Sequence, residues 1–297
     1  METSMLNHAE RSNNKRQVLS VLILTSAYMG VEVVGGLLTG SLALLSDAGH
    51  MLTDVAGLGL SLIAIYLADR PPSVKRSYGY FRAEILAAVV NSLILFGISF
   101  FILAEAYLRF SAPPKVQGGT MLVIGSMGLM VNLVGLWIMR KSSQKSLNIQ
   151  GAYFEVLSDA LTSVGVIVAA IIIWRTGWYI IDPIVSAGIG LFILPRTWKL
   201  LTEAISVLLE GVPADVDVAL LRKEILAVSG VSSLHDLHVW SLTSGVNALS
   251  AHVVIGRGVD RDQILAVIRS RLGEKFNISH VTVQVEREGF EESTVHE

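Results

Sequence analysis

The chain has 297 residues, of which 52% are hydrophobic and only 16% are charged. Soluble proteins of this size carry about a quarter charged residues, so the composition indicates a membrane protein. The net charge of −2 gives no sign of nucleic-acid binding, and the absence of cysteine excludes disulfides and thiolate metal ligands.

Several apolar segments are long enough to span a membrane, which takes about 20 largely apolar residues. The residues that precede them are polar and lack the apolar core and cleavage site of a signal peptide. We therefore predict an all-α domain of six transmembrane helices over residues 17–210, after a cytoplasmic N-terminal tail over residues 1–16. The predicted spans are residues 17–38, 43–67, 83–108, 118–139, 148–174 and 180–208.

Lys and Arg residues are concentrated on one side of the predicted membrane domain. If the N-terminus is inside, the outer links hold only Arg109, Lys115 and Arg175, and the inner segments hold many more basic residues. Because cytoplasmic loops carry an excess of Lys and Arg, both termini are predicted to be cytoplasmic. The compact loops and the absence of a targeting segment favour a bacterial inner (plasma) membrane.

Ionisable residues occur at helical spacing inside two of the predicted spans. His50 and Asp54 are four positions apart in the second span, and Glu155 and Asp159 have the same spacing in the fifth. Residues four apart lie on one helix face, and ionisable groups inside a membrane by default mark a substrate path. Four N and O donors from two helices suit a divalent cation such as Zn²⁺. The alternative is a polar clamp between helices that holds no metal.

Three further polar residues interrupt the apolar spans. Asp47 lies one turn before His50 and is expected to orient the imidazole or to accept protons, unless it only caps a helix or lines a cavity. Glu32 and Asn91 are expected to line a wet cavity. The two ligand pairs meet near mid-membrane only if the fifth helix begins near Leu147.

After Pro213 the sequence becomes that of a small soluble domain, predicted over residues 211–288. Its periodicity predicts a helix, two strands, a second helix and a third strand. This order fits a ferredoxin-like α+β layer with its helices on one face of the sheet. A domain this small gains stability by pairing with a second copy. The elements are expected at 215–228, 234–242, 246–255, 260–276 and 280–286, followed by a disordered tail at 289–297.

Five motifs in combination resemble the cation diffusion facilitator family of divalent metal/proton antiporters. They are SLALLSDAGHMLTD from Ser41, GYFRAE from Gly79, GAYFEVLSDALTS from Gly151, LLEGVP from Leu208 and HDLHVWSL from His235. The resemblance covers about residues 15–287. It implies efflux of Zn²⁺, and of Cd²⁺ or Co²⁺, in exchange for protons by a homodimer, and Mn²⁺ and Ni²⁺ stay open as substrates. In that family the second and fifth spans supply the transport site, which corresponds here to His50, Asp54, Glu155 and Asp159.

The chain departs from the family pattern at one ligand. Zinc-exporting members usually have His at the position of Glu155. A carboxylate there hardens the site and adds a negative charge, which is expected to widen the choice of metal. The loop 69–80 contains no histidine, so the second metal site that some relatives have in this loop is not expected.

The resemblance also implies a regulatory metal site in the cytoplasmic domain. The implied ligands are His235, His252 and Glu286, with His280 or Gln284 as a further one. The alternative is that these residues are only the polar face of a half-solvated sheet. His238 is expected on the opposite face from His235, in a structural role.

Two charged residues at the inner ends of the third and sixth spans match positions where relatives keep an interdomain charge pair. These are Arg82 and Glu210. Each residue is alternatively an interfacial anchor, because an exposed pair contributes only about 0–1 kcal/mol.

Two alternative functions would also account for ionisable residues in a membrane domain. An intramembrane metalloenzyme would need histidine boxes or an HExxH motif, but His50 is the only histidine between residues 9 and 234, so an enzyme is not expected. A passive metal channel or a metal-sensing membrane protein is left open. Saturation of the flux and its coupling to protons would separate a transporter from both.

Overall fold

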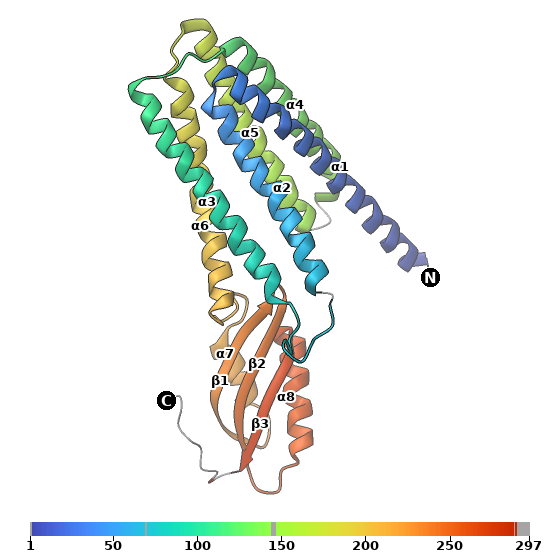
Figure 1. The fold of residues 1–297 in the computed structure, drawn as a ribbon. Helices are drawn as coiled ribbons and strands as arrows, with labels where there is room; N and C mark the ends of the chain where they lie inside the picture. The colour runs from blue at the N-terminus through green and yellow to red at the C-terminus, as the bar shows by residue number, and fades with distance from the viewer. Residues whose placement is uncertain (1, 69, 144–146, 288, 290–297) are drawn as a thin grey trace. The chain divides into compact units, whose positions relative to one another are not determined.

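The computed structural model describes residues 2–68, 70–143, 147–287 and 289. In this part of the chain, six long helices precede a smaller α/β domain (Figure 1). The chain divides into two compact units, Met1–Gly59 with Val90–Lys199, and Leu60–Val89 with Leu200–Glu297. The long helices are α1 (Glu2–Thr39), α2 (Leu42–Ala68), α3 (Arg82–Ser111), α4 (Gly118–Ser143), α5 (Leu147–Thr176) and α6 (Ile181–Leu208).

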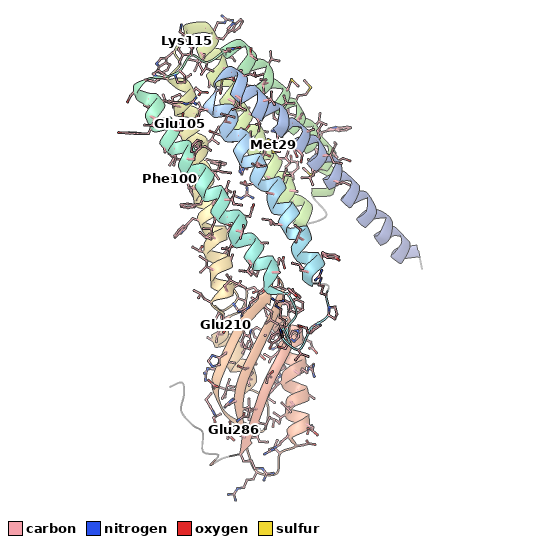
Figure 2. All side chains as sticks on the ribbon, viewed as in Figure 1. Met29, Phe100, Glu105, Lys115, Glu210 and Glu286 are labelled. Atoms are coloured by element: carbon pink, nitrogen blue, oxygen red, sulfur yellow. The ribbon has the colours of Figure 1, made fainter. Side chains whose placement is uncertain are left out.

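Five of the described helices contain stretches long and apolar enough to cross a membrane. The stretches are Leu19–Thr39, Arg82–Ser111, Gly118–Arg140, Ala152–Thr176 and Ile181–Leu208, close to five of the predicted spans. Large apolar side chains such as Phe100 on α3 point outward, where lipid would cover them (Figure 2). The chain is therefore an integral membrane protein.

Two helices need separate comment. α2 has 27 residues and covers the predicted second span, 43–67, although it is not among the five stretches named above. α1 begins at Glu2, so its backbone is helical through the polar stretch predicted as a separate tail. Polar residues such as Lys15, Arg16 and Gln17 are good helix formers, which allows a helix to extend beyond its apolar part. The predicted C-terminal tail, 289–297, lies outside the described residues except for residue 289.

The first unit is held together by α4, which packs against both α1 and α5. Buried apolar residues of α2, α4 and α5 form one core cluster, which includes Leu44, Met121 and Val166. Small residues let the backbones approach closely in such interfaces. A Cβ atom on Gly118 would lie 2.7 Å from the backbone nitrogen of Trp174, so α4 and α5 meet through this glycine.

A glycine on α4 also makes room for a buried tyrosine on α1. The Tyr28 hydroxyl lies 2.8 Å from Glu32 Oε1 and 3.0 Å from the backbone oxygen of Ile124. A Cβ atom on Gly128 would lie only 2.2 Å from this hydroxyl. Glu32 is completely buried, so the expectation that it lines a wet cavity is wrong, whereas Asn91 is partly exposed.

We expect Gly128→Ala to lower the melting temperature of the detergent-solubilised protein. The added methyl group must displace Tyr28, which leaves the Glu32 carboxyl without its hydroxyl partner at a cost of about 1–3 kcal/mol. The matched control is Gly97→Ala, because a Cβ atom there meets nothing within 4 Å. Equal melting temperatures for the two variants would contradict this account.

The second unit contains the predicted cytoplasmic domain, whose element order is the expected one. It comprises α7 (Val218–Leu226), β1 (Val231–Thr243), β2 (Val246–Ile255), α8 (Arg261–Phe276) and β3 (Ile278–Arg287). In the described part of the chain the strands form one sheet in the order β1-β2-β3, with β1 antiparallel and β3 parallel to β2. Residues of both helices and of all three strands share one buried cluster, so the helices cover a single face of the sheet. Asp217 and Asp260 cap the two helices.

A bulge in β1 changes which face its histidines occupy. His235 pairs with His252 and His238 pairs with Ser250, so two residues of β1 stand opposite one residue of β2. Asp236, inside the bulge, has a φ angle of 50°. The prediction that His238 faces away from His235 is wrong, because it assumed an uninterrupted alternation and the extra residue restores both to one face.

Candidate metal sites

The membrane domain brings one imidazole and two carboxylates together. His50 of α2 is buried, and its Nε2 atom lies 3.9 Å from Glu155 Oε1 and 3.8 Å from Asp159 Oδ1. Ligands of a tetrahedral Zn²⁺ lie about 3.3 Å apart, so each carboxylate would have to move towards the imidazole to share an ion with it. α5 begins at Leu147, as the meeting of the two pairs requires. The side chain of Asp54, the fourth predicted ligand, lies outside the described part of the structure.

Asp47 is linked to the turn of α5 that carries a predicted ligand. Its buried carboxylate accepts a hydrogen bond of 2.7 Å from the Thr162 hydroxyl. The same hydroxyl lies 2.9 Å from the backbone oxygen of Asp159. Asp47 therefore has a partner on the neighbouring helix, close to the cluster without being one of its three described members. The threonine gave no signal in the sequence, where it is an ordinary residue of an apolar span.

An arginine that was not among the predicted site residues lies at the same cluster. Arg196 of α6 binds Glu155 with both ends of its guanidinium group, Nη1 to Oε1 and Nη2 to Oε2. This bidentate geometry is the strongest form of a carboxylate ion pair. A lone arginine within an apolar span is the signal by which it could have been found.

A carboxylate in the first turn of α6 binds the beginning of the helix that carries His50. Asp182 is completely buried and accepts hydrogen bonds from the Ser41 hydroxyl at 2.6 Å and from the backbone nitrogens of Leu42 at 2.8 Å and Ala43 at 3.3 Å. The first backbone N–H groups of a helix lack partners within the helix, and a negative charge near them is stabilising. Asp182 thus fixes the N-terminus of α2 and was also missed from the sequence.

The cytoplasmic domain contains a second cluster, with one ligand on each strand. His235, His252 and Glu286 each offer an atom within 4.8 Å of the others. Glu286 is buried and lies near the end of β3 (Figure 2). Its carboxylate lies 3.1 Å from His252 Nδ1 and 3.4 Å from His235 Nε2. Gln284 donates a hydrogen bond of 2.9 Å to Glu286 and orients it. Two imidazoles and a carboxylate are a donor set that Zn²⁺ accepts, so these residues fit a metal ion.

The structure does not bring His280 or His238 into this cluster. His280 is exposed and pairs opposite Ala248, six residues before Glu286 on β3, which is about 20 Å along a strand. Its ring lies edge-on to Tyr78, with centroids 6.3 Å apart. The Nε2 atom of His238 lies 2.7 Å from the carboxylate of Asp236 in the bulge.

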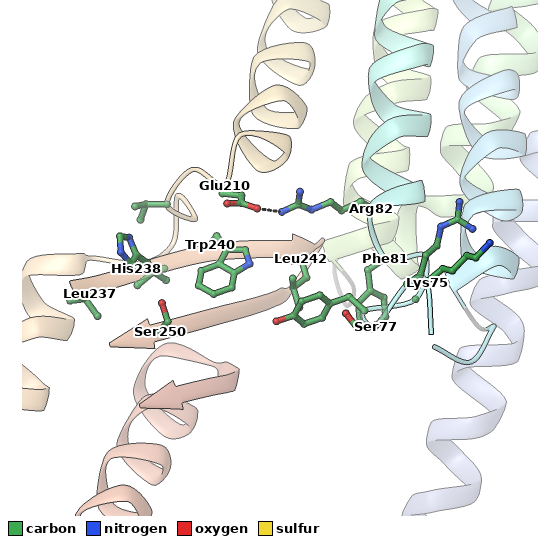
Figure 3. A pocket seen from close by; sticks show the side chains of 15 residues that line it. Lys75, Ser77, Phe81, Arg82, Glu210, Leu237, His238, Trp240, Leu242 and Ser250 are labelled. Carbon is green, nitrogen blue, oxygen red and sulfur yellow. Dashed lines mark hydrogen bonds and ion pairs between the residues drawn. The ribbon is translucent and has the colours of Figure 1, made fainter. Parts of the chain in front are cut away.

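The predicted charge pair is present within the second unit. Arg82 Nη2 lies 2.9 Å from Glu210 Oε1, and both residues line a pocket of about 870 Å³ (Figure 3). Both side chains are well exposed, so the pair is expected to contribute about 1 kcal/mol or less. Residues of the loop 75–81 and of β1 supply most of the remaining lining, among them Lys75, Tyr78 and Trp240.

Ionisable groups gathered between apolar helices, joined to a soluble domain with a second set of metal ligands, are typical of a membrane transporter for divalent cations. The chain belongs to the cation efflux family: residues 18–209 match its transmembrane domain and residues 213–288 match its cytoplasmic domain. This confirms the resemblance noted in the sequence. The protein is a transporter that exports divalent metal cations.

Several curated relatives are similar over nearly the whole chain. The metal cation efflux system protein CzcD of Cupriavidus metallidurans is 49% identical over 94% of this chain and 89% of its own length. A cadmium, cobalt and zinc/H⁺-K⁺ antiporter of Bacillus subtilis is 44% identical over 95% of this chain and 92% of its own length. The zinc transporter ZitB of Escherichia coli is 40% identical over 94% of this chain and 90% of its own length. The solved metal-bound C-terminal domain of CzcD is 47% identical over 24% of this chain and 99% of its own, with a TM-score of 0.23.

Proposed function

We propose that this chain exports Zn²⁺, with Cd²⁺ and Co²⁺ as further substrates, in exchange for protons. The transport site comprises His50, Asp54, Glu155 and Asp159. The observation that carries this assignment is the buried imidazole of α2, faced at 3.8 and 3.9 Å by two carboxylates of α5. The substrates named for the relatives at 40–49% identity support the choice of metals.

The exchange follows from the chemistry of the ligands. Metal ligands must be deprotonated, so a metal ion and protons exclude one another at the same site. The ion enters from the cytoplasm, the helices rearrange, and protons replace it on the outer side. Inward proton flow then drives metal outward, without any enzymatic step. Asp47, held by Thr162 beside the site, is the additional group that positions the ligands or takes up a proton.

The architecture that we propose extends the observed helices. α2, with 27 residues, also crosses the membrane and brings the number of spans to six. The transmembrane domain then covers residues 17–210 and lies in a bacterial inner membrane with both termini cytoplasmic. The domain over residues 211–288 takes a ferredoxin-like arrangement and pairs with a second copy of the chain. Its match to a cytoplasmic domain named for dimers supports the homodimer.

Transport in sealed vesicles tests this function. The purified chain is reconstituted, and Zn²⁺ movement is followed with an internal metal-sensitive dye while a pH gradient is imposed. We expect saturable Zn²⁺ flux that increases with the gradient, and proton movement in the opposite direction. A passive channel would give flux that ignores the pH gradient and does not saturate. Metal binding with no flux at all would favour a sensor.

We also propose that His235, His252 and Glu286 bind a regulatory metal ion. In the full-length protein, His252→Ala is expected to reduce bound Zn²⁺ by about one equivalent per chain, because it removes one of three ligands. Metal content after gel filtration measures this. The control is His238→Ala, which lies on the same face but is bonded to Asp236. Unchanged metal content in His252→Ala, or an equal loss in the control, would contradict the assignment.

A further inference from the structure

Glu155 faces two cationic or cation-binding groups at once. One side of its carboxylate approaches His50 Nε2, and both oxygens bind the guanidinium group of Arg196. The residues come from three different helices, α5, α2 and α6, and all lie in the first compact unit. The arginine is therefore part of the immediate surroundings of the proposed transport site.

The two uses of this carboxylate conflict. An ion bound to His50 and Asp159 would take Glu155 Oε1 as its next ligand, because this oxygen is the one that approaches the imidazole. Arg196 Nη1 already donates to that same oxygen. Arginine stays protonated under all ordinary conditions, so the conflict is not relieved by loss of a proton. A divalent ion must either displace the guanidinium group or bind without Glu155.

Arg196 is the more exposed partner of the ion pair and lies beside a point at which its helix can bend. Its side chain is 51% exposed, compared with 22% for Glu155. It directly follows Pro195, which lies inside α6. A proline within a helix removes one backbone hydrogen bond and kinks or loosens the helix at that point. A small change at Pro195 would therefore move the guanidinium group relative to α5.

We propose that Arg196 is a tethered cation that occupies Glu155 when no metal is bound and competes with the arriving divalent ion. The competition weakens metal binding, because only the fraction of molecules with Glu155 released can use it. It also speeds the release of the ion, because the guanidinium group can bind the Glu155 carboxylate again as the ion leaves. Arg196 is thus a positioning residue that sets the affinity and the release rate of the transport site. This inference rests on the proposed function.

The test is calorimetric titration of Zn²⁺ into the full-length protein, with His252→Ala as the background so that the cytoplasmic site is silent. Removal of the competitor in Arg196→Gln is expected to tighten binding about tenfold or more. Arg196→Lys keeps the charge but cannot form the bidentate bond, so it should bind with intermediate affinity. In vesicles, Arg196→Gln should lower both KM and kcat, because the ion is held more tightly and released more slowly.

A double-mutant cycle separates the ion pair from a general charge effect. With Glu155→Gln as the background, Arg196→Gln should change Zn²⁺ affinity by less than about twofold, because the bond no longer exists. Arg175→Gln, which removes a charge at the far end of α5, should leave affinity unchanged. Equal effects of Arg196→Gln in both backgrounds, wild-type affinity in Arg196→Lys, or weaker binding in Arg196→Gln would each overturn the proposal.

The same titrations show which assignment has failed. If Asp159→Asn binds Zn²⁺ as tightly as its parent, the transport site itself is wrongly placed. If Asp159→Asn loses binding but Arg196→Gln does not gain it, only the role of Arg196 is overturned.

Discussion

Asp159→Asn is expected to lower proton-driven Zn²⁺ flux by about a hundredfold or more, since changes even in the groups around a metal's ligands cost 10–100-fold. The amide keeps the size of the side chain but removes the anionic ligand that lies 3.8 Å from His50 Nε2. Initial rates in vesicles under an imposed pH gradient measure the effect. Asp159 is nearly completely buried, so the change does not alter the outer surface of the protein.

Two controls accompany this variant. Asp215→Asn makes the same chemical change at an exposed position and should transport at the normal rate. Retention of the metal equivalent that depends on His252 would show that Asp159→Asn is folded. Near-normal flux in a folded Asp159→Asn protein would exclude Asp159 as a ligand of the transported ion.

Asp182→Ala is expected to destabilise the protein by about 3–5 kcal/mol, the usual cost of breaking a buried charged network. The change leaves the Ser41 hydroxyl and the first backbone N–H groups of α2 without their acceptor. Arg109, whose Nη1 atom lies 4.0 Å from Asp182 Oδ2, also loses a nearby negative charge. Thermal and denaturant unfolding of the detergent-solubilised protein measure the loss.

Asp182→Asn gives a graded comparison. The amide keeps one acceptor oxygen but turns its NH₂ group towards the donors, so its stability should lie between those of the wild-type and alanine proteins. Asp215→Ala is the control at an exposed site. If Asp182→Ala unfolded at the same temperature as the control, the cap would not be what fixes the beginning of α2.

Local periodicity predicted the elements well because each element carries its own signal. Apolar windows located five spans to within a few residues, and β2 was predicted with its observed ends, residues 246 and 255. Helical spacing alone was also enough to predict that His50 approaches Glu155 and Asp159. These features depend on residues close in sequence, or on two regular faces that turn towards each other.

The missed features depend on pairings that no local pattern records. Arg196 meets Glu155 across 41 positions, and Asp182 meets Leu42 across 140. The bulge at Asp236 was missed for a different reason, because one inserted residue reverses the alternation on which the face of His238 was predicted. A charged side chain in an apolar span indicates that a partner exists but does not say which helix provides it.

The placement of the cytoplasmic ligands on three separate strands has a thermodynamic consequence. No two of His235, His252 and Glu286 are near neighbours in sequence, so the unfolded segment offers no ready-made chelate. An ion held there would clip both edge strands to the central one and would have to dissociate before the sheet opened. The free energy of unfolding of this domain would then rise with the concentration of free metal. Its resistance to unfolding would in this way report the metal content of the compartment that surrounds it.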